Sequence, residues 1–163
     1  RFGSSSRVFG EQLQDDGLER DVDAGNAAGW RLRNRRTLQL EQSAEIGGVD
    51  LAADLDDGTV AAIRRAWLDH QVIFVHDQDL DTDAFLAFAR RIGTPAEYPF
   101  VPGIDGYPEV IAVTKLAHEH VNFGGIWHSD TAYLDEPPIA RMLIAREVPQ
   151  AGGDTEFANM YLA

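Results

Sequence analysis

The sequence contains no cysteine among its 163 residues. Disulfide bonds and thiolate metal sites are therefore excluded. Any metal ion bound by this chain must use histidine, aspartate or glutamate, and such a nitrogen and oxygen ligand set favours iron, manganese or zinc. The absence of cysteine thus narrows the possible metal chemistry before any motif is considered.

The sequence also lacks an apolar run long enough to span a membrane, although hydrophobic residues make up 44% of it. The first residues, Arg1 to Ser6, carry no apolar segment of the kind found in secretory signals. We therefore predict a globular protein with no membrane partner and with the cytoplasm as its default location. The chain is long enough for one domain with a substantial core.

Positive charge is scarce, because 14 lysines and arginines face 27 aspartates and glutamates and the formal net charge is -13. Nucleic acid is excluded as a partner, since phosphate binding requires clustered lysine and arginine. The basic run at residues 31–36 is interrupted and is interpreted as a solvated strand edge or linker. An anionic substrate stays possible, because a local pocket can be positive in an acidic protein.

The beginning of the chain has little apolar periodicity. Residues 1 to about 30 are rich in glycine, serine, aspartate and asparagine, and we predict a flexible or disordered segment over residues 1–36. One domain is predicted over residues 37–163. Alternation in residues 37–41 predicts a first strand. Gly47 to Leu51 predict a turn that leads to an apolar contact.

Two helices and a buried strand are predicted next. Asp56 and Asp57 open a helix over about residues 58–69, because aspartate side chains cap the free N–H groups of a first turn. The continuous apolar run at residues 72–75 predicts a buried strand. A second helix is predicted over about residues 82–91, with Asp81 as part of its cap and a stop at Gly93. The predicted inward-facing residues are Val60, Ile63 and Trp67 in the first helix and Phe85, Phe88, Ala89 and Ile92 in the second.

The second half of the sequence alternates long loops with predicted strands. Prolines and glycines in residues 96–108 predict a loop with a lid or substrate-contacting role. Strands are predicted over residues 109–113, 140–146 and 154–157, and a helix is predicted from Asn159. This order of elements favours a mainly β structure with flanking helices, as in a barrel or jelly roll.

One segment combines a histidine and a carboxylate at a spacing that suits a metal ion. His128 and Asp130 stand two residues apart, and side chains at i and i+2 point to the same face of an extended segment. They can supply two of the three ligands in the facial triad that holds non-haem Fe(II). Such a pattern also arises by chance in surface turns, so the pair by itself leaves both interpretations open.

The neighbouring polar residues are weaker candidates. Ser129 is a poor nucleophile, because adjacent strand side chains point to opposite faces and the sequence lacks a Gly-x-Ser-x-Gly elbow around it. His70 and His76 flank the apolar run and are interpreted as polar strand termini. His118 and His120 are interpreted as solvated or substrate-facing loop residues.

Several motifs, in order, resemble one known family. They are residues 122–133 (NFGGIWHSDTAY), the pair Pro137-Pro138, residues 147–149 (EVP) and residues 152–161 (GGDTEFANMY). Together they resemble the taurine dioxygenase-like family of Fe(II)- and 2-oxoglutarate-dependent dioxygenases. Residues 70–78 (HQVIFVHDQ) resemble an early strand of that family. The resemblance covers about residues 38–163.

The resemblance implies a double-stranded β-helix, or jelly roll, with flanking helices. It implies that His128 and Asp130 are catalytic iron ligands, that Thr155 contacts the 2-oxoglutarate carboxylate, and that Trp127 packs beside the metal. The implied cofactors are Fe(II), 2-oxoglutarate and O2. The implied reaction hydroxylates a small organic acid and releases succinate and CO2.

Two residues of the family pattern have no counterpart in this sequence. The family's distal histidine ligand and the arginine that pairs with 2-oxoglutarate lie further downstream, and no histidine follows His128 here. The chain thus resembles the N-terminal part of a dioxygenase domain, with an incomplete jelly roll that is expected to be inactive alone. The alternative is a truncated, non-catalytic remnant or binding module of the same fold. Uncovered strand edges would also permit a homo-oligomer.

The resemblance places candidate substrate residues as well. In the taurine enzymes a histidine after the second helix and an asparagine before the iron motif hold the sulfonate. Tyr98 falls at the histidine position and Gly124 at the asparagine position, which disfavours taurine as the substrate. The predicted class is a sulfonate, sulfate ester or carboxylate. The candidate pocket residues are Tyr98, Phe100, Val101 and Asn122.

Overall fold

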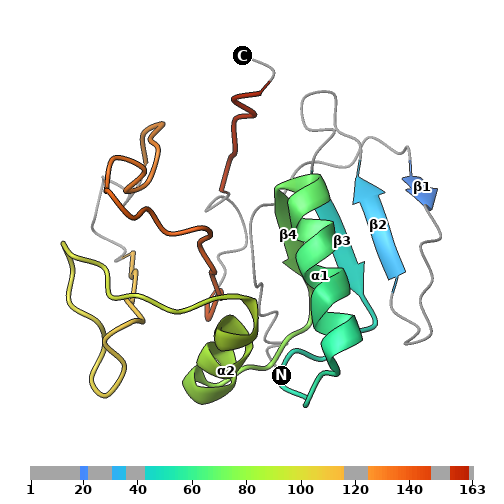
Figure 1. Ribbon diagram of the computed structural model, residues 1–163, viewed down its shortest axis with the longest axis horizontal. Helices are drawn as coiled ribbons and strands as arrows, with labels where there is room; N and C mark the ends of the chain where they lie inside the picture. Colours follow the sequence, from blue (N-terminus) through green and yellow to red (C-terminus); the bar gives the residue numbers. More distant parts are fainter. Residues whose placement is uncertain (1–18, 22–30, 36–42, 116–124, 148–154, 162–163) are drawn as a thin grey trace. The chain divides into compact units, whose positions relative to one another are not determined.

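The computed structural model describes residues 19–21, 31–35, 43–115, 125–147 and 155–161. The chain divides into two units, one formed by residues 1–92 with residues 142–163 and the other by residues 93–141. All helices and strands of the described residues belong to the first unit (Figure 1). Each unit is therefore described by itself.

The first unit contains a four-stranded sheet in the order β1-β2-β3-β4. β2 is antiparallel to both of its neighbours, whereas β3 and β4 are parallel, with Ala44 opposite Ile73 and Ile46 opposite Val75. A parallel pair requires a crossover connection, and helix α1 provides it. The strands are β1 at Glu19–Asp21, β2 at Arg31–Arg35, β3 at Ser43–Gly47 and β4 at Val72–Val75.

Both helices begin at an aspartate cap, as the sequence predicts. α1 spans Asp57–His70, and the N–H of Thr59 donates a hydrogen bond of 2.9 Å to Oδ1 of Asp56. This bond, with a second one from the Thr59 hydroxyl, lowers the pKa of the Asp56 carboxyl. α2 spans Thr82–Ile92, and Asp81 accepts a hydrogen bond of 2.8 Å from the N–H of Ala84. Neither described helix has the length and apolar character needed to cross a membrane.

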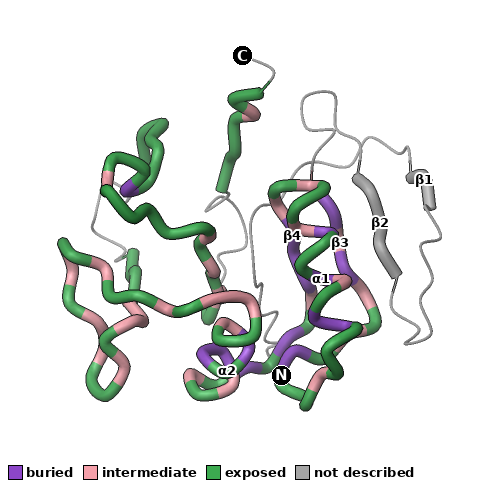
Figure 2. The backbone as a smooth tube through the Cα atoms, viewed as in Figure 1, coloured by how far each residue is buried: buried purple, intermediate pink, exposed green. Residues whose placement is uncertain are grey.

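The apolar core of the first unit is built by β3, β4 and the two helices (Figure 2). On β3 only alternate residues are buried, as expected for a strand with one covered face. On β4 three consecutive residues are buried, which confirms the prediction from its continuous apolar run. The buried side chains of these elements are Ala44, Ile46, Val60, Ile63, Ala66, Ile73, Phe74, Val75, Phe85, Leu86 and Phe88. Each fully buried isoleucine contributes about 1.5–3 kcal/mol through the hydrophobic effect.

A turn between β3 and α1 carries the chain back into this core. Gly48 adopts a φ of 75°, a left-handed conformation in which a side chain would be strained. Leu51 is then buried, which confirms the predicted turn and apolar contact. The side chain of Gln78 fastens the turn, because its Oε1 accepts a hydrogen bond from the N–H of Leu51 and its Nε2 donates to the carbonyl oxygen of Val49.

The predicted helix faces need two corrections. Trp67 was predicted to lie in the core, but it is only partly buried, and Ala66 takes the buried position on that turn of α1. On α2 the buried face includes Leu86, whereas Ala89 and Ile92 are half-buried. Val60, Ile63, Phe85 and Phe88 are buried as predicted. The other buried positions differ because a helical face is wider than the strict spacing of three and four residues.

The N-terminal part of the sheet lies where a flexible segment was predicted. β1 and β2 fall within residues 1–36, and the basic run forms β2, which pairs on both sides. The predicted strand at residues 37–41 lies outside the described residues. The domain boundary at residue 37 therefore stays a prediction.

Residues 93–141 contain turns and one isolated bridge between Ile104 and Tyr107, and no helix or strand among those described. The strand predicted at residues 109–113 is therefore wrong. The N–H of Val110 donates to Tyr107 and its carbonyl accepts from Ile104, so a local turn uses the groups that a strand would offer to a partner.

The strands predicted in the last part of the chain are also absent from the described residues. Residues 140–146 and 155–157 form no strand, although Ile144 takes part in a single β-bridge, and Asn159 is followed only by a turn at residues 160–161. A strand requires a neighbour for its backbone groups, whatever its own side-chain pattern. The predicted combination of a sheet and flanking helices is confirmed, whereas the complete jelly roll stays a prediction.

Candidate metal centre

His128 and Asp130 lie together, as their spacing predicts. Nε2 of His128 is 3.4 Å from Oδ1 of Asp130. On the other side of the ring, Nδ1 of His128 lies 2.7 Å from the carbonyl oxygen of Ile126. Because a carbonyl oxygen only accepts hydrogen bonds, Nδ1 is the donor of this contact, and Nε2 faces the carboxylate.

This arrangement suits a cation. A lone pair and a carboxylate oxygen repel each other unless a proton or a metal ion lies between them. Two ligand atoms about 2.1 Å from one metal ion and about 90° apart are separated by about 3.0 Å. The observed separation of 3.4 Å is close to this value, and both side chains are 49% exposed, so an ion can reach them. The pair therefore fits two positions of a metal site with nitrogen and oxygen ligands.

A turn directly after Asp130 fixes the backbone of this segment. The N–H of Ala132 donates to the carbonyl oxygen of Asp130, and the N–H of Leu134 donates to that of Thr131 at 3.1 Å. Thr131 is 4% exposed, in a segment that is otherwise mostly open to solvent. The aspartate thus stands at the edge of a turn that is anchored by one buried residue.

Arg141 is the residue of this site that the sequence analysis missed. Its Nη2 donates a hydrogen bond of 2.7 Å to Oγ1 of Thr131, and its Nε lies 3.4 Å from Oδ2 of Asp130. Its guanidinium carbon lies 5.1 Å from the ring centroid of Tyr98, within cation–π distance. In the sequence this residue appeared only as the polar end of an apolar run, so no signal connected it with the aspartate.

The described part of the chain supplies two candidate metal ligands here and not three. Among the described residues no group of three histidine, aspartate or glutamate side chains is placed to hold a metal ion. His118 and His120 lie outside the described residues.

The other predicted site residues are placed in different parts of the chain. Tyr98 and Phe100 form an edge-to-face pair with ring centroids 5.5 Å apart, and Phe100 remains 60% exposed. Val101 is half-buried and Trp127 is exposed. Thr155 is exposed and belongs to the first unit, whereas Asn122 lies outside the described residues.

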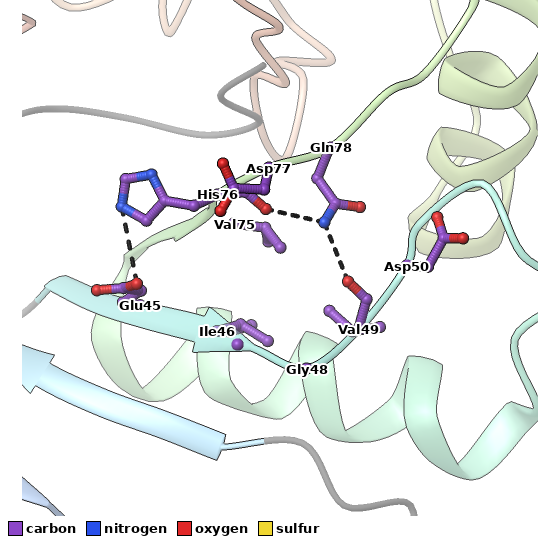
Figure 3. A pocket seen from close by; sticks show the side chains of 10 residues that line it. Glu45, Ile46, Gly48, Val49, Asp50, Val75, His76, Asp77 and Gln78 are labelled. Atoms are coloured by element: carbon purple, nitrogen blue, oxygen red, sulfur yellow. Dashed lines mark hydrogen bonds and ion pairs between the residues drawn. The ribbon is translucent and has the colours of Figure 1, made fainter. Parts of the chain in front are cut away.

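A pocket of about 550 Å³ lies in the first unit, where β3 and β4 end (Figure 3). Nε2 of His76 is 3.8 Å from Oε1 of Glu45 across it. Gln78 spans another side, with Nε2 donating to the carbonyl oxygens of Val49 and His76 at 3.0 and 2.9 Å. No predicted site residue that the structure describes lines this pocket. Its polar groups connect the ends of the two strands, which agrees with the interpretation of His76 as a strand terminus.

The histidine and aspartate pair on its turn is a candidate pair of ligands for a metal ion that prefers nitrogen and oxygen donors. Residues 34–163 match the family described as taurine catabolism dioxygenase TauD, TfdA family. Because this match covers most of the sequence, the chain belongs to the TauD/TfdA family. The resemblance found in the motifs is thereby confirmed.

Individual relatives agree with this family. The chain is 38% identical over 117 residues to an alpha-ketoglutarate-dependent sulfate ester dioxygenase of Pseudomonas putida, a match that covers 71% of this chain and 38% of the relative. It is 34% identical over 125 residues to an alkylsulfatase of Acinetobacter baylyi, covering 76% of this chain and 38% of the relative. It is 32% identical over 132 residues to an (S)-phenoxypropionate/alpha-ketoglutarate-dioxygenase of Sphingobium herbicidovorans, covering 77% of this chain and 45% of the relative. The chain therefore spans less than half the length of these relatives.

Proposed function

We propose that this chain is the N-terminal part of an Fe(II)- and 2-oxoglutarate-dependent dioxygenase that hydroxylates a small organic acid and releases succinate and CO2. The observation that carries the proposal is the geometry of His128 and Asp130, with Nε2 and Oδ1 facing each other at 3.4 Å. Membership of the TauD/TfdA family and the names of the relatives support it.

In this proposal His128 and Asp130 would hold the iron, and the bound iron with 2-oxoglutarate and O2 would supply the chemistry that oxidises a C–H bond. The carbonyl oxygen of Ile126 keeps the proton of His128 on Nδ1 and so keeps Nε2 available. Asp130 supplies a negative charge that lowers the net charge of the site. As the resemblance implies, Trp127 would pack beside the metal, and the Thr155 hydroxyl would contact the 2-oxoglutarate carboxylate.

We infer the remainder of the site from the length of the relatives, since the matched region is less than half of each. A distal histidine and an arginine for 2-oxoglutarate would come from a further segment, which would also complete the jelly roll. We propose the cytoplasm as the location, where 2-oxoglutarate is available, and leave self-association as a second possibility for covering open strand edges.

The proposed substrate is an organic anion with an apolar body, such as a sulfate ester, a sulfonate or an aryloxy carboxylate. The names of the relatives include sulfate ester and phenoxypropionate dioxygenases. In this chain the edge-to-face pair of Tyr98 and Phe100 lies in the same unit as the two metal ligands. Partly exposed aromatic rings are suited to contact the apolar body of such a substrate.

A non-catalytic remnant or binding module of the same fold is the second candidate. It is favoured by one observation, that the described residues provide two ligands and not three. A protein of this kind would retain the fold without turnover.

Succinate formation distinguishes the two candidates. The protein at its full natural length is incubated with Fe(II), 2-oxoglutarate and ascorbate, and succinate is measured with a panel of sulfate esters, sulfonates and aryloxy acids. We expect substrate-dependent succinate, a loss of roughly 100-fold or more in His128→Ala, and little change in the matched variant His70→Ala. No substrate-dependent succinate with any compound of the panel would favour the binding module.

A further inference from the structure

Arg141 contacts the candidate metal ligand Asp130, and the proposed function gives this arginine no role. The two oxygens of Asp130 face different partners: Oδ1 lies 3.4 Å from Nε2 of His128, and Oδ2 lies 3.4 Å from Nε of Arg141. The plane of the carboxylate is therefore set by two groups on opposite sides. The oxygen that faces the histidine is the one available to a metal ion.

The guanidinium of Arg141 contacts two consecutive residues at once. Nε points to Asp130, while Nη2 donates a hydrogen bond of 2.7 Å to the hydroxyl of the buried Thr131. A guanidinium can do this because its five N–H donors lie in one rigid plane. The buried threonine thus acts as a fixed point from which the arginine reaches the more exposed aspartate.

The same guanidinium also lies against Tyr98. The distance from the guanidinium carbon to the ring centroid is 5.1 Å, and Tyr98 in turn packs edge-to-face against Phe100. Arg141 therefore connects the metal ligand Asp130 with the aromatic pair through contacts that all lie within residues 93–141.

We propose that Arg141 is a positioning residue that holds Oδ2 of Asp130 and so reserves Oδ1 as the single oxygen offered to the metal ion. One-oxygen ligation by the aspartate keeps other coordination positions open for 2-oxoglutarate and O2. Residues that orient metal ligands in this way typically change metal affinity by about 10–100-fold when they are replaced. The inference rests on the proposed function, because it assumes that His128 and Asp130 bind a metal ion.

The decisive variant is Arg141→Lys. Lysine keeps the positive charge near the metal but lacks the planar guanidinium, which can donate hydrogen bonds to two partners at once. Replacement by a neutral residue would also remove a repulsion of the metal ion, which would act in the opposite direction. The matched control is Arg64→Lys in the first unit. Arg64 likewise lies over an aromatic ring, that of Trp67 at 5.8 Å, and donates to a partner, the carbonyl oxygen of Ile92.

The experiment measures the dissociation constant of Co(II) for the full-length protein, together with the visible absorption of the Co(II)-loaded form and the unfolding midpoint of the metal-free form. We expect Arg141→Lys to weaken Co(II) binding by about 10-fold and to change the position of the visible bands, with the unfolding midpoint unchanged. Arg64→Lys should leave both the dissociation constant and the spectrum as in the natural protein.

Thr131→Val provides a second test that does not depend on the stability of the Arg141 variant. It removes the hydroxyl that anchors the arginine and keeps the side-chain shape, and we expect a weakening of Co(II) binding in the same direction. Unchanged or tighter Co(II) binding in both Arg141→Lys and Thr131→Val would overturn the positioning role. If the natural protein itself binds no Co(II), the proposed function fails and not the arginine contact alone.

Discussion

The two units of this chain keep their structure by different means. In the first unit, side chains from β3, β4 and α1 pack into a continuous core, and backbone groups pair within helices and the sheet. In residues 93–141, the described backbone closes through short turns, and large apolar side chains such as Ile126, Trp127 and Tyr133 are exposed. The candidate metal ligands His128 and Asp130 belong to residues 93–141, which form loops and turns. Binding and catalytic residues are often found on loops.

The difference has a physical consequence for the candidate site. The first unit is held by many buried apolar contacts, whereas the segment around Asp130 depends on a few polar contacts made by Thr131 and Arg141. Local stability is low where few apolar contacts are buried. Metal binding would therefore contribute to the order of residues 125–134, because a ligand that binds only the ordered form stabilises it.

The strongest test of this difference is the removal of the candidate metal ligand Asp130 in the second unit. We expect Asp130→Ala to weaken Co(II) or Fe(II) binding by roughly 100-fold or more, since it removes a ligand and not only the orienting group behind it. The overall unfolding free energy should stay within about 0.5 kcal/mol, because Asp130 is exposed and belongs to no core. Isothermal titration and denaturant unfolding measure the two quantities.

The matched variant for that test is Asp135→Ala, an exposed aspartate in the same unit. It should leave metal affinity unchanged. If Asp130→Ala and Asp135→Ala retain equal affinity, the metal is held elsewhere and the candidate centre is wrong.

A second prediction compares the same substitution in both units. Ile46 is 1% exposed on β3, whereas Ile126 is 80% exposed beside the candidate centre. Ile46→Ala should reduce the free energy of unfolding by about 2–5 kcal/mol, through lost burial and the cavity left behind. Ile126→Ala should change it by about 0.5 kcal/mol or less. Denaturant unfolding of the two variants measures both effects. Equal losses would show that Ile126 is covered in the full-length protein, and the contrast between the units would then disappear.

The sequence predicted α1, β4 and α2 of the first unit because local signals and packing agree there, whereas it did not predict β1, β2 and β3. Asp56 and Asp81 mark helix starts by their capping chemistry, and the apolar run of β4 can only be a buried strand at that length. The predictions for residues 109–113 and 140–146 failed because the side-chain pattern of a segment does not determine how its backbone groups are paired. In the first of these segments the backbone groups of Val110 are used in a local turn.

The candidate site was predictable only in part. The spacing of His128 and Asp130 places their side chains together, since it depends on nothing beyond the extended backbone. Arg141 was not predictable, because its approach to Asp130 depends on how the chain turns between them. Likewise, the carbonyl oxygen of Ile126 that fixes the histidine tautomer belongs to the backbone and leaves no mark in the sequence.

A third prediction concerns the hydrogen bonds of Gln78, which join the turn after β3 to the end of β4 in the first unit. Gln78 is 6% exposed and exchanges hydrogen bonds with Leu51, Val49 and His76. Gln78→Ala should reduce the free energy of unfolding by about 1–3 kcal/mol, because it leaves the buried N–H of Leu51 without its acceptor. The neighbouring exposed Asp79→Ala is the control and should cost about 0.5 kcal/mol or less. A loss for Gln78→Ala no larger than that of the control would mean that water replaces the amide.

The smallest expected effect concerns the cap of α1 and its dependence on pH. The hydrogen bond from the backbone of Thr59 lowers the pKa of the Asp56 carboxyl below its ordinary value of 3.8. The ionised carboxylate therefore stabilises the folded form above that value, and the contribution is lost as the pH falls through the lower, folded-state pKa. Amide hydrogen exchange in the first turn of α1 measures this locally.

Two substitutions separate the acceptor from the charge at this cap. Asp56→Ala removes both and should speed exchange of the Thr59 amide at neutral pH, whereas Asp56→Asn keeps a side-chain oxygen and should slow it again. In Asp56→Asn the acid dependence contributed by this group should vanish, because an amide does not titrate. If exchange in Asp56→Asn rises at low pH as much as it does in the natural protein, other carboxylates cause the loss of stability in acid. The Asp56 cap would then act only as a hydrogen-bond acceptor and not through its charge.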